Sequence, residues 1–384
     1  MQKSEQRILT THVGSLPRPL ALRDLLIRQE RGEAVDLTEL DQQVAAAVHR
    51  VIRRQQEAGI DVANNGEQPR VGFSTYVTSR MSGFGGESAR PTAIDAQEFP
   101  DWAERRQAQR RHASKIDNAP QAIGDVTYTG FDATATECDT FLRWSEAVPF
   151  TERFMTAASP GIIATTMLNA HYDTYEAYVY ALGKQMQHEY ELIHSRGLLL
   201  QIDCPDLAME RSRFFQELSP SQFQDRVALH IDAINQAVVN IPPDRMRLHV
   251  CWGNHDGPHR HDVPLADILP RLYDAKVGAL SIELANPRHQ HEYKLFRSHP
   301  LPDDMLLLPG VIDSTVHYIE HPEVVADRIC QVAEAVGDRS RIIASTDCGF
   351  GTFAGSEAVV ESVVWAKLQT LKEGAELAST RLWS

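Results

Sequence analysis

Met246-Arg-Leu-His-Val-Cys-Trp252 is a short, mostly apolar run that is followed by polar, glycine-containing sequence. Successive side chains of a strand project to opposite faces, so His249 and Cys251 would point the same way. Such runs are typical of strands that are buried in a parallel sheet. The number of these runs, and what separates them, therefore decides the fold.

Eight short apolar runs of this type recur along the 384-residue chain. We expect strands at 8–15, 60–66, 161–168, 198–204, 246–252, 279–285, 305–313 and 341–348. Apolar residues at helical spacing predict helices between most of them, at 37–58, 174–195, 219–240 and 322–336. Strands that alternate with amphipathic helices indicate a parallel sheet, and eight such units predict a (β/α)8 TIM barrel. A doubly wound open sheet is the alternative.

Residues 70–150 interrupt this alternation. The segment is polar and contains one short run, 122–129, that predicts a strand. We expect a long insertion between the second and third barrel strands, built as a helix and a hairpin over the barrel mouth. Residues 1–384 are then a single barrel domain, with 70–150 as its cap.

Composition narrows the class of protein. The chain has 38 Lys and Arg against 52 Asp and Glu, a net charge of −14, which argues against nucleic acid and anionic membranes as partners. No run approaches the roughly 18 apolar residues of a membrane span, and residues 1–7 lack a signal-peptide core. The five scattered cysteines are expected to be thiols or ligands in a reducing compartment. We therefore expect a cytoplasmic protein, and the sequence leaves a homo-oligomer open.

The carboxyl ends of the strands carry the chemistry in barrels of this kind. Polar residues gather at these ends of the predicted strands: His12, Ser15, Asn64, Asn65, Glu67, Asn169, Asp203, Cys204, His249, Cys251, Glu283, Asn286, Asp313, Asp347 and Cys348. Burying so many ionisable groups without a function would be costly. Their convergence predicts a polar site at the barrel mouth.

Four of these residues form a candidate metal site. His249, Cys251 and Cys348 offer imidazole and thiolate ligands, and Glu283 adds a carboxylate. This set fits Zn2+ better than iron or magnesium. A displaceable Glu283 would leave a position for an incoming thiol, whose pKa zinc lowers. The same position could activate water for hydrolysis, but two thiolate ligands make zinc a poorer Lewis acid, which favours thiol activation.

At these residues the chain resembles the catalytic C-terminal domain of cobalamin-independent methionine synthases, and also the related epoxyalkane:coenzyme M transferases. The likeness runs from Thr11-His-Val-Gly-Ser-Leu-Pro17 to Cys348-Gly-Phe350. It implies a (β/α)8 barrel. It also implies zinc as the cofactor, with ligands that fall on His249, Cys251, Glu283 and Cys348.

The resemblance further implies which residues hold the thiol substrate. Gly14-Ser15-Leu16-Pro17 resembles the Gly-Ser-Phe-Pro element, which places Ser15 against the amino acid carboxylate. Gly66-Glu67 and Gln201-Ile-Asp-Cys-Pro205 resemble two segments whose acids hold the homocysteine amino group. That role therefore falls on Glu67 and Asp203, and paired carboxylates are what an ammonium requires.

Two positions depart from the family pattern. Thr-Met-Leu-Asn-Trp is Thr166-Met-Leu-Asn-Ala170 here, so the Trp that stacks on the folate pterin is missing. Gly-Val-Tyr-Asp-Ile-His is Gly310-Val-Ile-Asp-Ser-Thr315, so Thr315 replaces the catalytic His that assists protonation of the folate leaving group. Asp313 or His255 could act as the acid instead. The thiol half of the site matches the family and the folate half does not.

The sequence therefore predicts a zinc-dependent methyltransferase that alkylates a small-molecule thiol, above all homocysteine, to give methionine. Its second partner is an alkyl donor, which could be a folate, a methylated corrinoid or another compound. Addition of coenzyme M to an epoxide is the alternative, because that reaction needs no folate site. Retention of both ammonium-binding acids favours the amino acid thiol.

Overall fold

The structure, a computed structural model, describes residues 1–109, 114 and 119–384. Eight parallel strands form a sheet in the order β1, β10, β9, β8, β7, β6, β5, β2. They are β1 (Leu9–Thr10), β2 (Val62–Ala63), β5 (Glu152–Ala158), β6 (Leu199–Asp203), β7 (Met246–Val250), β8 (Ala279–Ile282), β9 (Leu306–Ile312) and β10 (Ile343–Thr346). A parallel bridge between Thr11 and Val62 closes the ring. The predicted (β/α)8 barrel is therefore confirmed, and the open sheet is not formed.

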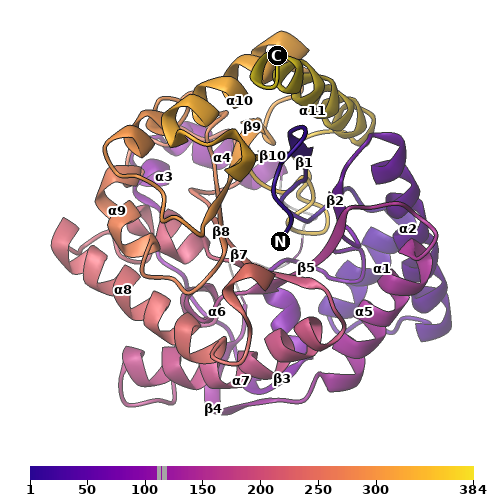
Figure 1. The fold of residues 1–384 in the computed structure, drawn as a ribbon. Coiled ribbons are helices and arrows are strands. Elements are labelled where there is room, and N and C mark those ends of the chain that lie inside the picture. The colour runs from indigo at the N-terminus through magenta and orange to yellow at the C-terminus, as the bar shows by residue number, and fades with distance from the viewer. Residues whose placement is uncertain (110–113, 115–118) are drawn as a thin grey trace.

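Helices surround these strands on the outside of the ring (Figure 1). They are α1 (Leu20–Glu30), α2 (Leu37–Glu57), α5 (Phe131–Ser145), α6 (Pro160–Thr166), α7 (Tyr175–Ser195), α8 (Pro220–Ala237), α9 (Leu265–Leu272), α10 (Pro322–Val336) and α11 (Glu361–Leu382). The four predicted helices are confirmed to within three residues as α2, α7, α8 and α10. Within the described part of the chain, no helix is long and apolar enough to cross a membrane.

Capping groups in the sequence explain where several helices begin and end. The Asp36 side chain accepts hydrogen bonds from the amides of Thr38 and Glu39 and so starts α2. Ser219 starts α8 with a capping box that it forms with Gln222. Gly337 ends α10 in the left-handed conformation that glycine tolerates best.

One predicted strand is wrong. Most of the expected strand 161–168 lies in helix α6 (Pro160–Thr166), and the third barrel strand is β5, which lies just before it. Ser159 caps α6 by accepting from the Ile162 amide, and Pro160 occupies its first turn. A short apolar run cannot be told from a buried helix by periodicity alone. Asn169 therefore follows a helix, and its side chain bonds the backbone of Tyr172.

Between β2 and β5 the chain forms a two-stranded antiparallel sheet and several short helices. The predicted strand at 122–129 is β4 (Gln121–Tyr128), which pairs with β3 (Met81–Gly85). The helices are a 3-10 turn (Thr75–Ser79), α3 (Ile94–Glu98) and α4 (Pro100–Gln109), with α5 after β4. Residues 110–113 and 115–118 of the expected cap lie outside the described residues.

Buried ion pairs join the parts of this segment and attach it to α7. Arg70 Nε lies 3.0 Å from Glu137 Oε1 on α5, and Arg80 pairs with both Glu137 and Glu189, the latter on α7. All four side chains are almost fully buried. Breaking one partner of such a pair would leave a buried charge, so these contacts fix the segment to the barrel.

Candidate metal centre and active site

Three of the predicted metal ligands converge at the carboxyl ends of β7 and β10. The donor atoms of His249, Cys251 and Cys348 all lie within 4.8 Å of one another. The two Sγ atoms are 3.6 Å apart, and all three side chains are buried. Neither ring nitrogen of His249 has a hydrogen-bond partner. Because buried polar atoms are normally satisfied, these nitrogens indicate a position where a ligand binds.

The protonation states of the three side chains suit a soft divalent cation. Burial and the nearby Arg247 lower the pKa of His249 to about 3, so its imidazole is neutral. The adjacent Cys348 sulfur and burial raise the pKa of Cys251 well above its ordinary value. Contact with Cys251 lowers the pKa of Cys348, but burial and the nearby acids Glu283 and Asp203 together raise it more, so the net shift is upward. Two thiols and a neutral imidazole fit zinc, which displaces the thiol protons when it binds.

Glu283, the fourth predicted ligand, lies beside this cluster at the end of β8. Its Oε1 accepts from the Trp252 amide at 3.1 Å, and its Oε2 accepts from Asn286 Nδ2 at 3.0 Å. Burial, then Cys251 and Asp347, raise the pKa of Glu283 well above its ordinary value. Its hydrogen bonds hold the carboxylate next to the Cys251 strand end without placing it inside the three-residue cluster.

Asp347 connects the ends of β8 and β10. Its Oδ1 accepts from the amides of Leu284 and Ala285 at 2.9 and 2.8 Å, and its Oδ2 accepts from the Asn286 amide at 2.8 Å. These bonds tie the residues after Glu283 to the residue before Cys348. Gly310 makes room for the carboxylate, since a Cβ there would lie 2.1 Å from Asp347 Oδ1.

One cavity joins the cluster to the predicted substrate-binding residues. Its lining includes Ser15, Glu67, Asp203, His249, Cys251 and Cys348. Asp203 pairs with His249 in the register of β6 and β7, so neighbouring strand ends carry an acid and a candidate metal ligand side by side. The structure thus brings together six of the predicted site residues, whereas Glu283 and Asp313 line a different cavity.

Glu67 and Asp203 form a buried pair of acids in this cavity. Burial and then the Glu67 charge raise the pKa of Asp203 well above its ordinary value. Burial also raises the pKa of Glu67, against the opposing effects of Arg70 and Arg18. Glu67 Oε1 accepts from Thr156 Oγ1 at 2.9 Å, while Oε2 is buried without a partner. A cation bound between the two acids would relieve their repulsion and satisfy the open oxygen.

The backbone at Glu67 is held in an unfavourable conformation. Its φ is +54°, in the left-handed region that side-chain-bearing residues rarely adopt. Asn64 Oδ1 accepts from the Gly66 amide and Asn65 Oδ1 accepts from the Glu67 amide, at 2.8 and 2.9 Å. These two side chains maintain the turn that aims Glu67 into the cavity, as is common at functional sites.

Asp313 and Thr315 line a second cleft on another side of the cluster. This second cleft is also lined by Glu283, Asp347 and Cys348. Asp313 Oδ1 accepts from both the amide and the hydroxyl of Thr315, at 2.8 and 2.7 Å. Thr315, which stands where the family pattern has its catalytic His, therefore donates its hydroxyl hydrogen bond to Asp313.

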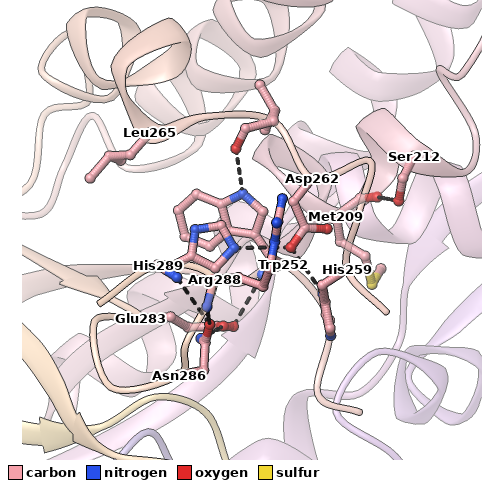
Figure 2. A network of polar contacts seen from close by, with 12 residues as sticks. Met209, Ser212, Trp252, His259, Asp262, Leu265, Glu283, Asn286, Arg288 and His289 are labelled. Carbon is pink, nitrogen blue, oxygen red and sulfur yellow. Dashed lines mark hydrogen bonds and ion pairs between the residues drawn. The ribbon is translucent and has the colours of Figure 1, made fainter. Parts of the chain in front are cut away.

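A polar network that includes Trp252, His289 and Asp262 surrounds Glu283 (Figure 2). His289 bonds Asp262 at 2.9 Å and Glu292 at 2.7 Å, and its ring lies 4.3 Å from that of Trp252. Although burial opposes it, these two carboxylates raise the pKa of His289 to about 10, so the ring is cationic at neutral pH. The cation lies against the Trp252 ring and lowers the pKa of the nearby Glu283, against the larger effects that raise it.

Sequence reasoning missed several residues that position the site. Arg247 donates through Nε to Gln201 Oε1 at 2.7 Å, and Gln201 donates to Asp203 Oδ1 at 2.7 Å. Both are polar residues in the middle of apolar strands, a signal that could have identified them. Thr156, which bonds Glu67, was hidden because β5 was not recognised.

Comparison with known proteins agrees with this architecture. Residues 8–98 match the family described as the catalytic domain of cobalamin-independent synthases. The methionine synthase of Thermococcus kodakarensis is 24% identical over 376 residues, covering 97% of this chain and 94% of that protein. That of Sulfolobus acidocaldarius is 26% identical over 345 residues, covering 88% and 85%.

A solved structure shows the same fold over nearly the whole chain. The B12-independent methionine synthase from Shewanella sp. W3-18-1, in complex with selenomethionine, matches with a TM-score of 0.71 at 20% identity, covering 98% of this chain and 99% of that one. Fold and site together define a (β/α)8-barrel protein with a buried sulfur and imidazole cluster at the carboxyl ends of its strands. The chain is similar to methionine synthases over most of its length, and its residues 8–98 match the catalytic domain of the cobalamin-independent synthase family.

Proposed function

We propose that this chain is a metal-dependent methyltransferase that transfers a methyl group to the sulfur of homocysteine and so makes methionine. The observation that carries the proposal is one cavity that contains both the His249, Cys251 and Cys348 cluster and the acid pair. Relatives named methionine synthase, which align over most of the chain, support homocysteine as the thiol.

Zinc is the metal that this donor set fits best. His249, Cys251 and Cys348 would hold it, with Glu283 as a fourth, replaceable ligand. When bound, zinc supplies the positive charge that keeps a substrate thiol ionised near neutral pH. His249 is already neutral in the fold, so it loses no proton when the metal binds, whereas the two cysteines do.

The chain's own residues hold the amino acid end of the substrate. Glu67 and Asp203 bind the ammonium. Its positive charge offsets the repulsion between the two acids, and it donates a hydrogen bond to the unpartnered Oε2 of Glu67. Ser15, whose Oγ lies 3.4 Å from the Gly351 amide, faces the same cavity and binds the carboxylate. Together they orient the sulfur toward the cluster and away from bulk water, as an oriented reaction requires.

Addition of coenzyme M to an epoxide is the second candidate. One observation favours it: Arg90, Arg106 and Arg213 also line the cavity, and a guanidinium is a good partner for a sulfonate. The acid pair favours homocysteine, because coenzyme M has no ammonium to place between Glu67 and Asp203. The two substrates would therefore use different residues of the same cavity: the acid pair for the ammonium of homocysteine, and the arginines for the sulfonate of coenzyme M.

Metal analysis and proton release together test the proposal. The purified protein is expected to contain about one zinc per chain, and homocysteine is expected to release a proton when it binds to the zinc-loaded protein. Cys251→Ser should lose the metal, whereas Cys330→Ser, at a half-buried cysteine outside the cluster, should keep it. A protein that binds no zinc with both cluster thiols reduced would overturn the proposal. Proton release with coenzyme M and not with homocysteine would favour the second candidate.

A further inference from the structure

Thr166, the last residue of α6, has a buried hydroxyl without a partner. Its side chain is fully buried, and its Oγ1 forms no hydrogen bond with any of the described residues. The neighbouring Thr165 shows the ordinary arrangement of a helical threonine, because its Oγ1 donates to the Gly161 carbonyl, one turn earlier, at 3.1 Å. Buried hydroxyls normally have a partner, so the unpaired hydroxyl of Thr166 requires an explanation.

The position of Thr166 in the fold suggests a ligand as that partner. Ile162 and Thr166 are four residues apart on α6 and therefore share one face of the helix. Both line the cavity that contains the metal cluster and the acid pair. The described residues that line the second cleft do not include Thr166. Its side chain therefore belongs to the wall of the thiol site.

The chain segment that carries Thr166 also contacts both acids. β5 lies between β2, which precedes Glu67, and β6, which ends with Asp203. On β5, Thr156 Oγ1 donates to Glu67 Oε1 at 2.9 Å. Just before α6, the Ser159 amide donates to the Asp203 carbonyl at 3.1 Å. These two contacts fix the start of α6 relative to the acid pair that holds the substrate ammonium in the proposed function.

We infer that Thr166 is a substrate-binding residue, whose hydroxyl forms a hydrogen bond with the amino acid end of the thiol substrate. The inference rests on the proposed function. A hydroxyl both donates and accepts, so it can bond either polar group of an amino acid. In the free protein the unpaired hydroxyl lowers stability, because it has lost its contact with water. Substrate binding removes this cost and so gains affinity.

Replacement of Thr166 should therefore raise stability while it lowers affinity. In the zinc-loaded full chain without substrate, Thr166→Val removes the unpaired hydroxyl, and we expect the urea midpoint to rise. Thr165→Val is the matched control, since it removes a hydroxyl that bonds the Gly161 carbonyl, and its midpoint should fall. A fall in the midpoint of Thr166→Val would overturn the inference, because the hydroxyl would then have a structural role.

The affinity for two thiols provides the second readout. Homocysteine binding is followed through the proton that it releases, and propanethiol, which has the sulfur but no amino acid group, is the comparison. Thr166→Val should weaken homocysteine about 5- to 10-fold, as expected for the loss of one hydrogen bond, and leave propanethiol unchanged. Thr166→Ser, which keeps the hydroxyl, should restore most of the affinity, and Thr165→Val should change neither thiol. Equal weakening of both thiols by Thr166→Val would overturn the inference.

The failure of this inference can be told from failure of the proposed function. If homocysteine releases a proton from the zinc-loaded protein and Thr166→Val binds it as tightly as wild type, only the role of Thr166 is wrong. If homocysteine releases no proton from the zinc-loaded wild type, the proposed function itself is wrong.

Discussion

The Sγ atoms of Cys251 and Cys348 lie 3.6 Å apart, although 97 residues separate them in the chain. They come from β7 and β10, strands that are separated in the sheet by β8 and β9. The curvature of the sheet into a barrel brings the two thiols together. The pair is therefore a direct indicator of the folded mouth and of any metal held there.

Metal removal should expose this pair to oxidation. A disulfide requires the sulfurs to approach to about 2.05 Å, a small movement from their present separation. We expect diamide to join Cys251 and Cys348 in the metal-free protein and zinc to prevent it, as measured by thiol titration and peptide mapping. Cys348→Ser should abolish the cross-link. Equal oxidation with and without zinc would contradict ligation by these two residues.

Removal of either acid in the substrate cavity should weaken homocysteine binding. A charge-assisted hydrogen bond contributes about 1.5–3 kcal/mol, so Glu67→Gln or Asp203→Asn should raise the KM for homocysteine about 10- to 100-fold. Zinc content should stay unchanged, because neither residue belongs to the cluster. A variant that lost its zinc without a change in KM would show that the acids support the metal instead.

Gly310→Ala should disturb Asp347 without altering its charge. The added Cβ would lie 2.1 Å from Asp347 Oδ1 and 2.7 Å from its Cα, so the backbone must shift. Overpacking of this kind costs about 1–3 kcal/mol, and Cys348 would move with its neighbour. Urea denaturation and the rate of zinc loss to a chelator would measure both effects. Gly124→Ala is the control, since nothing lies within 4 Å of its added Cβ.

The stability contributed by His12 should depend on pH. Burial lowers the pKa of His12 to about 4, although a hydrogen bond to Gln55 opposes the shift. Below about pH 6.5 the unfolded chain binds a proton at His12, whereas the folded chain binds it only below about pH 4. The free energy of unfolding therefore falls as the pH falls through this window. The advantage of wild type over His12→Asn should shrink by about 3 kcal/mol from pH 7 to 4. Urea denaturation of both proteins across this pH range tests the prediction. A stability difference that does not change with pH would contradict it.

The barrel could be predicted because its strands and helices carry local signals. Seven of the eight strands coincide with apolar runs, and Asp36, Ser219 and Gly337 mark helix ends. The failure came at β5, whose first residues, Glu152 and Arg153, are polar because they bond the chain at the amino end of the barrel. Local pattern does not record such long-range partners.

The candidate site could be predicted only in part. Strand ends predicted the candidate ligands and the acid pair that the structure brings together, since barrel topology places such ends side by side. The role of Asp347 depends on three amides that follow another strand, and the role of Asn254 depends on a carbonyl after β10. These contacts join residues 61 to 95 positions apart, and no sequence spacing specifies them.

Gly253–His255 lies between two cavities that both reach Cys348, and Asn254 holds it there by bonding the Gly349 carbonyl and Ser314 Oγ. This arrangement has a consequence for the order in which the proposed substrates bind. Since thiol and donor would use separate openings, neither molecule obstructs the path of the other. Initial-rate plots against both substrates should then intersect, and each product should be able to depart while its counterpart is still bound. The architecture therefore imposes no compulsory order in which the two substrates bind.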